Sequence, residues 1–252
     1  MIPAIKTFWI LATITTIFVC PLSNAQKATF DAPWNQWIEK DFPFFSCVVD
    51  ARAEGITDNL TPRAIVLPLG NGYYLAYDVD LLRIAVIWKA KDIPFENVSM
   101  SVNSYPYELK KVGGGQGTLP KPKGKILFQN GIYPGVGSGA PDFTDHRPLQ
   151  PTKEEVGRGA LDPKVVRFKG IKLRSPLELE YEIAKTLVRE RIRLGKGGLV
   201  RRLDIEPHEK SLYFVLAHTD PDTPEFSCQA DGRIERIEDR AVCVIQIGRA
   251  HV

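Results

Sequence analysis

Apolar and polar residues alternate through much of this chain, which is the period of a β-strand. The clearest example is a pair of runs, Arg63–Leu69 and Tyr73–Tyr77, rich in β-branched, aliphatic and aromatic residues. Between them lie Gly70, Asn71 and Gly72, which tolerate the positive φ that a tight hairpin turn requires. The pattern therefore predicts two antiparallel strands that meet at this turn.

The next run, Leu81–Trp88, is apolar on both faces, which is typical of a strand covered on both sides. Strict alternation places four of its large residues on one face: Leu82, Ile84, Val86 and Trp88. Arg83 falls inside this run, and a buried charge needs a partner, for which Asp78 or Asp80 is the nearest candidate. We favour an ion pair at this point, and a ligand-binding cluster of the three charged residues is the alternative.

The second half of the chain returns to strand patterns, with short runs separated by turn residues. We expect strands at Val165–Leu173, Leu177–Ile183, Thr186–Leu194, Leu199–Ile205, Ser211–Ala217 and Ala241–Ile245. Many short strands with few helical periods predict a mostly β fold, an antiparallel β-sandwich. A short N-terminal helix is predicted at Trp34–Lys40.

Two neighbouring strands carry complementary charges. Three glutamates and three arginines are expected to face each other across a hairpin: Glu178, Glu180 and Glu182, and Arg189, Arg191 and Arg193. Glu190 differs from these because it shares the apolar face of its strand. A carboxylate in that position is either paired or suited to proton transfer, and we favour a structural pair.

The stretch Asn103–Pro163 is rich in Gly and Pro and is predicted to form long loops, with one strand at Lys125–Phe128. Asp145 and His146 lie in this stretch, close to other charged residues. They are candidates for ligand binding, and His146 is also a candidate acid or base. Their spacing matches no metal-ligand pattern, so no metal site is predicted and a solvated loop is the favoured interpretation.

The N-terminal residues have the pattern of a signal peptide. A positive charge in Met1–Lys6 precedes the apolar run Phe8–Val19, and small residues lead up to Ala25. We therefore expect residues 1–25 to be removed, a single domain at 26–246, and a periplasmic or extracellular location. No membrane span is expected after cleavage, and an uncleaved anchor is the alternative.

Three cysteines remain after the predicted signal peptide: Cys47, Cys228 and Cys243. In an oxidising compartment at most one disulfide forms, with Cys228 and Cys243 as the likelier pair and small buried hydrophobic residues as the alternative. The chain has no CxxC or CxxCH motif, so no zinc ribbon and no covalent haem are predicted within it. The net charge of +3 is small and dispersed, which argues against nucleic-acid binding.

Six phrases of the sequence carry a family resemblance: DFPFFSCVVDAR, DNLTPRAIVLPLGNG, YDVDLLRIAVIW, NGIYPG, EEVGRGAL and VRERIRL. Over roughly Trp34–Ile245 the chain resembles an uncharacterised domain family near the N-terminus of large exported bacterial proteins. The resemblance implies downstream sugar-dehydrogenase-like β-propeller and c-type haem domains as partners within the same natural chain. It implies no cofactor in this segment, with haem c further downstream, and it supplies no catalytic residues.

The last six residues, Ile247–Val252, are those that ATC GGA AGA GCA CAC GTC, the start of a common sequencing adapter, would encode. We therefore expect residues 247–252 to be adapter read-through. The domain is then expected to be truncated near Gln246.

Together these patterns favour a non-catalytic accessory module that binds carbohydrate, such as a polysaccharide, or docks neighbouring domains, because binding requires no catalytic constellation. Loop aromatic residues would offer the stacking surface that sugars prefer: Tyr105, Tyr107 and Tyr133. The candidate ligand-binding residues are Asp78, Asp80, Arg83, Tyr133, Asp145 and His146. The alternative is a carbohydrate-active enzyme of the hydrolase or epimerase type, in which Glu190, Asp80 or His146 supplies acid and base. A structural spacer is a third hypothesis.

Overall fold

The computed structural model describes residues 43–52, 59–90, 98–102, 119–148, 158–218, 226–228 and 232–246. The predicted signal peptide, the predicted helix at Trp34–Lys40, residues 247–252, Tyr105 and Tyr107 lie outside these ranges. Within them the chain is mostly β, and its strands pair antiparallel in sandwich-like sheets, which confirms the predicted fold class. No helix in the described ranges is long and apolar enough to cross a membrane.

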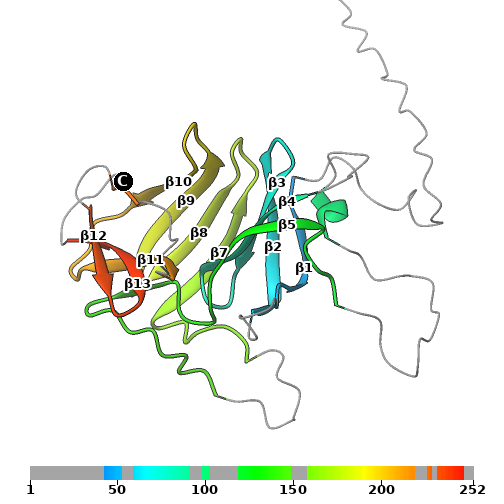
Figure 1. The fold of residues 1–252 in the computed structure, drawn as a ribbon. Coiled ribbons are helices and arrows are strands. Elements are labelled where there is room, and N and C mark those ends of the chain that lie inside the picture. The colour runs from blue at the N-terminus through cyan, green and yellow to red at the C-terminus, as the bar shows by residue number, and fades with distance from the viewer. Residues whose placement is uncertain are drawn as a thin grey trace, which may run out of the picture. The chain divides into compact units, whose positions relative to one another are not determined.

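The first sheet is a five-stranded meander in the order β1-β2-β3-β4-β5 (Figure 1). Its strands are β1 (Phe45–Asp50), β2 (Leu60–Gly70), β3 (Tyr73–Asp78), β4 (Arg83–Ala90) and β5 (Gly124–Gln129). The predicted hairpin is confirmed as β2 and β3, and its turn residues Asn71 and Gly72 have φ of 54° and 75°. A glycine at the second position avoids the steric cost that a Cβ meets at positive φ. A short 3-10 helix, η1 (Val98–Ser101), follows β4.

Two four-stranded sheets complete the fold, in the orders β10-β9-β8-β7 and β12-β13-β11-β6. The first contains β7 (Val166–Lys172), β8 (Glu178–Ile183), β9 (Thr186–Leu194) and β10 (Leu199–Ile205). The second contains β6 (Val136–Ser138), β11 (Leu212–His218), β12 (Gly232–Ile237) and β13 (Arg240–Ile245). The strands expected in this half of the chain are present within a few residues, whereas β1, β6 and β12 were not predicted.

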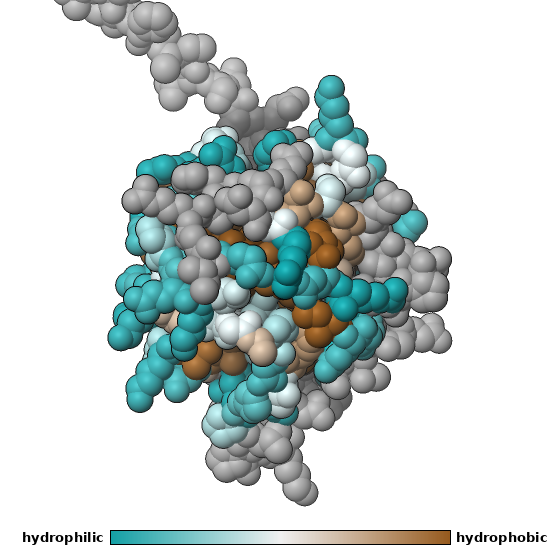
Figure 2. Space-filling view, turned by 90° about the vertical axis from the view of Figure 1, so that its left-hand side faces the viewer, coloured by the Kyte–Doolittle hydropathy of each residue, from teal (hydrophilic) through white to brown (hydrophobic). Residues whose placement is uncertain are grey.

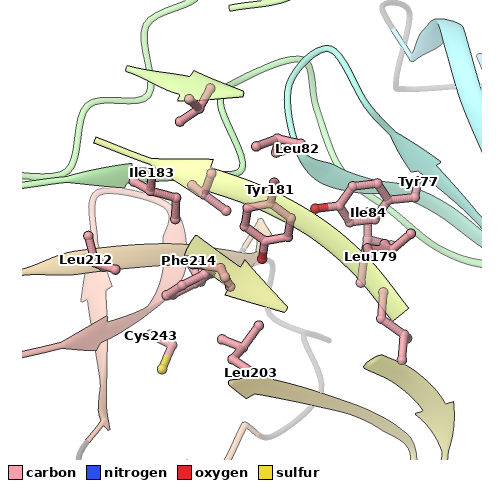
Figure 3. Packing of buried hydrophobic residues seen from close by; sticks show 14 of the residues in the cluster. Tyr77, Leu82, Ile84, Leu179, Tyr181, Ile183, Leu203, Leu212, Phe214 and Cys243 are labelled. Carbon is pink, nitrogen blue, oxygen red and sulfur yellow. The ribbon is translucent and has the colours of Figure 1, made fainter. Parts of the chain in front are cut away.

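The largest apolar core cluster receives side chains from all three sheets. Figure 3 shows this packing, with Tyr77, Leu179, Tyr181, Phe214 and Cys243 gathered from different sheets. A second cluster lies on the opposite face of the first sheet and includes Trp88, whose indole nitrogen donates to the Ser101 carbonyl at 2.9 Å. The first sheet is therefore covered on both faces, as the apolar run around β4 predicts.

A β-bulge in β4 changes which of its side chains lie on each face of the first sheet, compared with the prediction. Tyr77 pairs with Ile84 while Ala76 pairs with Val86, so Ala85 is an extra residue in the ladder. Because an inserted residue reverses the alternation, Leu82 and Ile84 point into the large core but Val86 and Trp88 point into the second cluster. The prediction of one shared face for these four residues is wrong.

Candidate functional site

Arg83 is the centre of a buried polar cluster where β3 turns into β4. Its side chain is fully buried, and its guanidinium donates hydrogen bonds to five residues. The acceptors are Asp78 Oδ2 at 3.1 Å, Asn59 Oδ1 at 3.2 Å, Thr61 Oγ1 at 3.4 Å, and the carbonyls of Asn130 at 3.0 Å and Gly131 at 2.8 Å. Every guanidinium nitrogen is therefore engaged within the protein, so Arg83 has no free nitrogen to offer a ligand.

Asp78 is the ion-pair partner of Arg83, and it also shapes the turn. Its Oδ1 accepts the backbone N–H groups of Asp80 at 3.0 Å and Leu81 at 3.2 Å. Burial raises the pKa of Asp78 and lowers the pKa of Arg83, in each case against the opposing charge of the partner. The ion pair expected from the sequence is confirmed, and the other hydrogen bonds of Arg83 join this turn to the segment around Asn130.

Asp80 pairs with a different arginine, Arg63 of β2. The carboxylate is buried, whereas 57% of the Arg63 side chain is exposed. The hydrogen bond to Asp80 raises the pKa of Arg63 despite partial burial. The carboxylate of Asp80 is therefore held by a cation and covered by protein.

The loop that contains Asp145 packs against the same turn. Asp145 pairs with Arg147 at 2.8 Å and with Arg158 at 3.4 Å, and Arg147 also donates to the Gly159 carbonyl at 2.6 Å. The Leu161 backbone N–H donates to the Asp80 carbonyl at 3.1 Å. Burial opposes ionisation of Asp145, but the hydrogen bonds and charge of Arg147 outweigh it and lower the pKa of this carboxyl.

We refer to Arg63, Asp78, Asp80, Arg83, Asp145 and Arg147 as the arginine–carboxylate cluster. Burial opposes the charge of Arg147, but the hydrogen bond and charge of Asp145 outweigh it and raise the pKa of Arg147, and the charges of Asp78 and Asp80 add to this effect. Four of the six predicted ligand-binding residues belong to this cluster. Sequence reasoning missed the roles of Arg63 and Arg147, because their partners are distant in sequence or lie in an irregular loop.

Tyr133 is buried and does not offer the exposed stacking surface expected of it; only 2% of the residue is accessible. Its hydroxyl donates to Asn130 Oδ1 at 2.7 Å, and the guanidinium of Arg240 lies 4.7 Å from the ring centroid. The ring of Phe143 meets it edge to face at 6.5 Å. The expectation of an exposed ring is wrong because β13 places the side chain of Arg240 over Tyr133.

His146 lies on an exposed part of the loop. Its Nε2 is 2.7 Å from Oδ2 of Asp142, and both side chains are more than half exposed. The hydrogen bond from His146 lowers the pKa of Asp142. In the described ranges no group of three or more His, Cys, Asp or Glu residues is placed to hold a metal ion.

Glu190 is fully buried at the centre of the β10-β9-β8-β7 sheet and accepts two hydrogen bonds. Arg201 Nε donates to Oε1 at 2.6 Å, and the Tyr181 hydroxyl donates to Oε2 at 2.8 Å. Arg201 also donates to the Val215 carbonyl at 3.3 Å. Burial works against the charge of Arg201, but the charge of Glu190 outweighs it and raises the pKa of the guanidinium.

The favoured structural pair for Glu190 is thus confirmed, and its partner is Arg201. A signal for this partner existed in the sequence, because Leu199, Arg201, Leu203 and Ile205 alternate along one face of β10. Burial raises the pKa of Tyr181 far above its usual value, and the charge of Glu190 adds to this effect. The tyrosine therefore remains a neutral hydrogen-bond donor to the carboxylate.

The opposite face of this sheet carries two of the expected glutamate–arginine pairs, whereas Glu182 lies opposite Leu187 and pairs with Lys169, and Arg193 lies opposite Val200. Glu180 pairs with Arg189 at 3.1 Å, and Glu178 pairs with Arg191. We call this surface the charged face, and its members are Lys169, Lys172, Glu178, Glu180, Glu182, Arg189, Arg191, Arg202 and Asp204. Glu178 is an exception to the predicted wet face, because it is fully covered by the cations around it.

The comparisons with known proteins concern the middle of the chain. A family model for a domain of unknown function (DUF6797) matches residues 75–190. The chain is similar to this family over a range that runs from β3 to Glu190 and includes Asp78, Arg83 and Asp145. The resemblance to an uncharacterised domain family is thereby supported over a shorter range than expected. No curated protein and no solved structure matches the chain.

Proposed function

We propose that the chain is a non-catalytic accessory module of an exported bacterial multidomain protein, periplasmic or extracellular, and that it docks a neighbouring domain through its charged face. The supporting observation is that the buried carboxylates considered for catalysis are each held by an arginine. Glu190 is bound by Arg201, and Asp80 is bound by Arg63. A general acid or base must reach a substrate proton, whereas these carboxylates are covered by protein.

Docking is favoured over carbohydrate binding because of where the aromatic residues lie. The large hydrophobic residues exposed in the described part of the chain are aliphatic: Leu127, Val165, Leu173 and Val200. Sugar binding commonly uses an exposed aromatic ring as a stacking surface. The carbohydrate hypothesis therefore depends on Tyr105 and Tyr107, which lie outside the described residues.

The charged face has the composition of a surface that recognises charge of both signs. Lysines of β7 and arginines of β9 pair with the glutamates of β8 between them, and Asp204 of β10 pairs with Arg191 of β9. Figure 2, which views the left-hand side of Figure 1, shows hydrophilic side chains interspersed with apolar patches on that side of the molecule. Complementary charge gives specificity and register to a contact between domains. The resemblance implies propeller and c-type haem domains as the partners, which fits a role in sugar oxidation.

The test is lysine cross-linking of the full-length natural protein followed by mass spectrometry. Lys169 and Lys172 belong to the charged face, whereas Lys125 is an exposed lysine of β5 in another sheet and serves as the control. We expect Lys169 and Lys172 to link to another domain and Lys125 to show no such link. Links from Lys125 instead, or no interdomain link at all, would refute docking through this face.

An enzymatic role has its own test. The chain is incubated with a panel of oligosaccharides, and products are separated by chromatography. We expect no turnover. Turnover that is lost in Glu190→Gln but kept in Glu180→Gln would refute the non-catalytic proposal, because the two variants remove equal charge from neighbouring strands.

A further inference from the structure

Two cysteine sulfur atoms lie next to each other where β13 contributes to the large apolar core. Cys228 Sγ is 3.5 Å from Cys243 Sγ, and no disulfide joins them in the structure. Cys243 is a buried residue of β13, where it pairs with Phe214 on one side and Ile234 on the other. Cys228 is half-buried, belongs to a segment outside the strands and packs against the same core.

Gly232 provides the space that the two sulfur atoms occupy. A Cβ at this position would lie 2.5 Å from Cys228 Sγ and 3.2 Å from Cys243 Sγ. The φ of Gly232 lies outside the left-handed region, so its backbone does not require glycine. The missing side chain, rather than backbone freedom, is therefore what this first residue of β12 contributes.

We propose that Cys228 and Cys243 form an intramolecular disulfide, and that Gly232 provides the space for it. An S–S bond is about 2.05 Å long, so the sulfur atoms must approach by about 1.5 Å from their present separation. Cys243 is held by hydrogen-bonded strands on both sides, so Cys228 makes most of the movement. The closed loop contains β12, the edge strand of its sheet, and the bond would tie this edge to β13.

The bond forms by thiol–disulfide exchange with an external disulfide as the oxidant. The Cys228 thiolate attacks one sulfur of the oxidant, and the other sulfur leaves as a thiolate. The Cys243 thiolate then attacks Cys228 Sγ and releases the second half of the oxidant. The two cysteine thiols together lose two electrons and two protons, and the oxidant is reduced to two thiols.

The environments of the thiols set the order of these steps. Burial raises the pKa of Cys243 to about 12, with a smaller effect from the neighbouring Cys228. Cys228 is the less buried thiol and therefore reacts first with the oxidant. The attack by Cys243 is the slow step and accelerates as pH rises.

Cys47 has a different environment. It lies in β1 and packs against the second core cluster, on the opposite face of the first sheet from the large core that receives Cys243. Burial raises the pKa of Cys47 to about 12 as well. We therefore expect it to remain a thiol. The proposal does not rest on the docking role, although the predicted export would supply an oxidising compartment.

The test is peptide mapping of the folded chain after incubation with oxidised glutathione at mildly alkaline pH. Remaining thiols are alkylated, and the unreduced digest is analysed by mass spectrometry. We expect Cys228 and Cys243 to lose both thiols and to appear in one linked peptide pair, with Cys47 alkylated. Separate alkylation of Cys228 and Cys243, a persistent glutathione adduct on Cys228, or a link to Cys47 would overturn the proposal.

Variants separate the role of Gly232 from that of the sulfur atoms. Cys47→Ser should leave the linked pair unchanged, and Cys228→Ser should abolish it while Cys243 remains alkylatable. Gly232→Ala should slow bond formation by about tenfold or more, because access to the attacked sulfur governs the exchange rate. Circular dichroism confirms that each variant is folded. Bond formation at the wild-type rate in Gly232→Ala would refute the role of Gly232.

Discussion

The ion pair between Glu190 and Arg201 gives the sharpest prediction about stability. The perturbation is Arg201→Met, which keeps an apolar stem in the core but removes the cation from Glu190. The carboxylate then retains the hydrogen bond from Tyr181 and has no contact with solvent. The Val215 carbonyl also loses its bond to the guanidinium.

The magnitude follows from the burial of the remaining charge. Removing one partner of a buried ion pair costs about 3–5 kcal/mol, because the other charge stays desolvated and uncompensated. We therefore expect the free energy of unfolding to fall by this amount in Arg201→Met.

A double variant and a surface control isolate the electrostatic effect. Replacing both Glu190 and Arg201 with Met removes both charges and leaves the Tyr181 hydroxyl as the main uncompensated group. The double variant should therefore be more stable than Arg201→Met, with a coupling energy of about 2–3 kcal/mol. The matched control is Arg189→Met on the neighbouring strand, whose partner Glu180 lies on the charged face, and it should cost less than about 1 kcal/mol.

The assay is urea unfolding followed by circular dichroism, with linear extrapolation to zero denaturant. If Arg201→Met and Arg189→Met lowered the free energy of unfolding by the same small amount, the reasoning would be refuted, because the buried and the surface arginine would then contribute equally to stability. A double variant that is less stable than Arg201→Met would also contradict it.

Three further predictions concern the arginine–carboxylate cluster and its neighbours. Arg83→Lys should destabilise the protein by about 2 kcal/mol or more in urea unfolding, because an ammonium group cannot satisfy the same spread of acceptors; an unchanged midpoint would contradict this. Asp145→Asn should cost about 1–3 kcal/mol at neutral pH. The pKa of Asp145 is lowered in the folded state, so the stability that its ionised carboxylate contributes is present above the unfolded pKa and is lost as pH falls through the folded pKa. The difference in free energy of unfolding between Asp145→Asn and the wild type should therefore close in acid. A difference that does not change with pH would refute this. Gly135→Ala should destabilise the protein by about 1–3 kcal/mol, because the added Cβ would lie 2.3 Å from the Leu82 carbonyl oxygen. The control is Gly197→Ala, which has open space around the added Cβ and should change thermal stability little.

Much of the fold could be predicted from local pattern. The hairpin of β2 and β3 follows from its glycine-rich turn, and β8 and β9 follow from alternating residues. These features depend on residues close in sequence, so the chain itself contains the information. The strands β6 and β12 were missed, because they are short or carry little apolar alternation and are defined by the strands beside them.

The candidate site was predictable in part. The pairing of Arg83 with Asp78 could be inferred because the two residues are neighbours across a turn and a buried charge requires compensation. The partner of Asp80 is Arg63 of β2, which sequence alone did not indicate. The bulge at Ala85 could not be inferred either, because it depends on how β4 pairs with β3.

The sequence by itself determined the fold class, the main hairpins and the need of Arg83 and Glu190 for partners. These conclusions hold because strand period, turn chemistry and the cost of burying charge act locally. Tertiary structure decided which side chains meet: Arg201 lies at Glu190, Tyr133 lies buried beneath Arg240, and two cysteines share the space beside Gly232. The contact between Tyr133 and Arg240 joins segments distant in sequence, and the geometry of all three contacts depends on how the strands pair and pack around a common core.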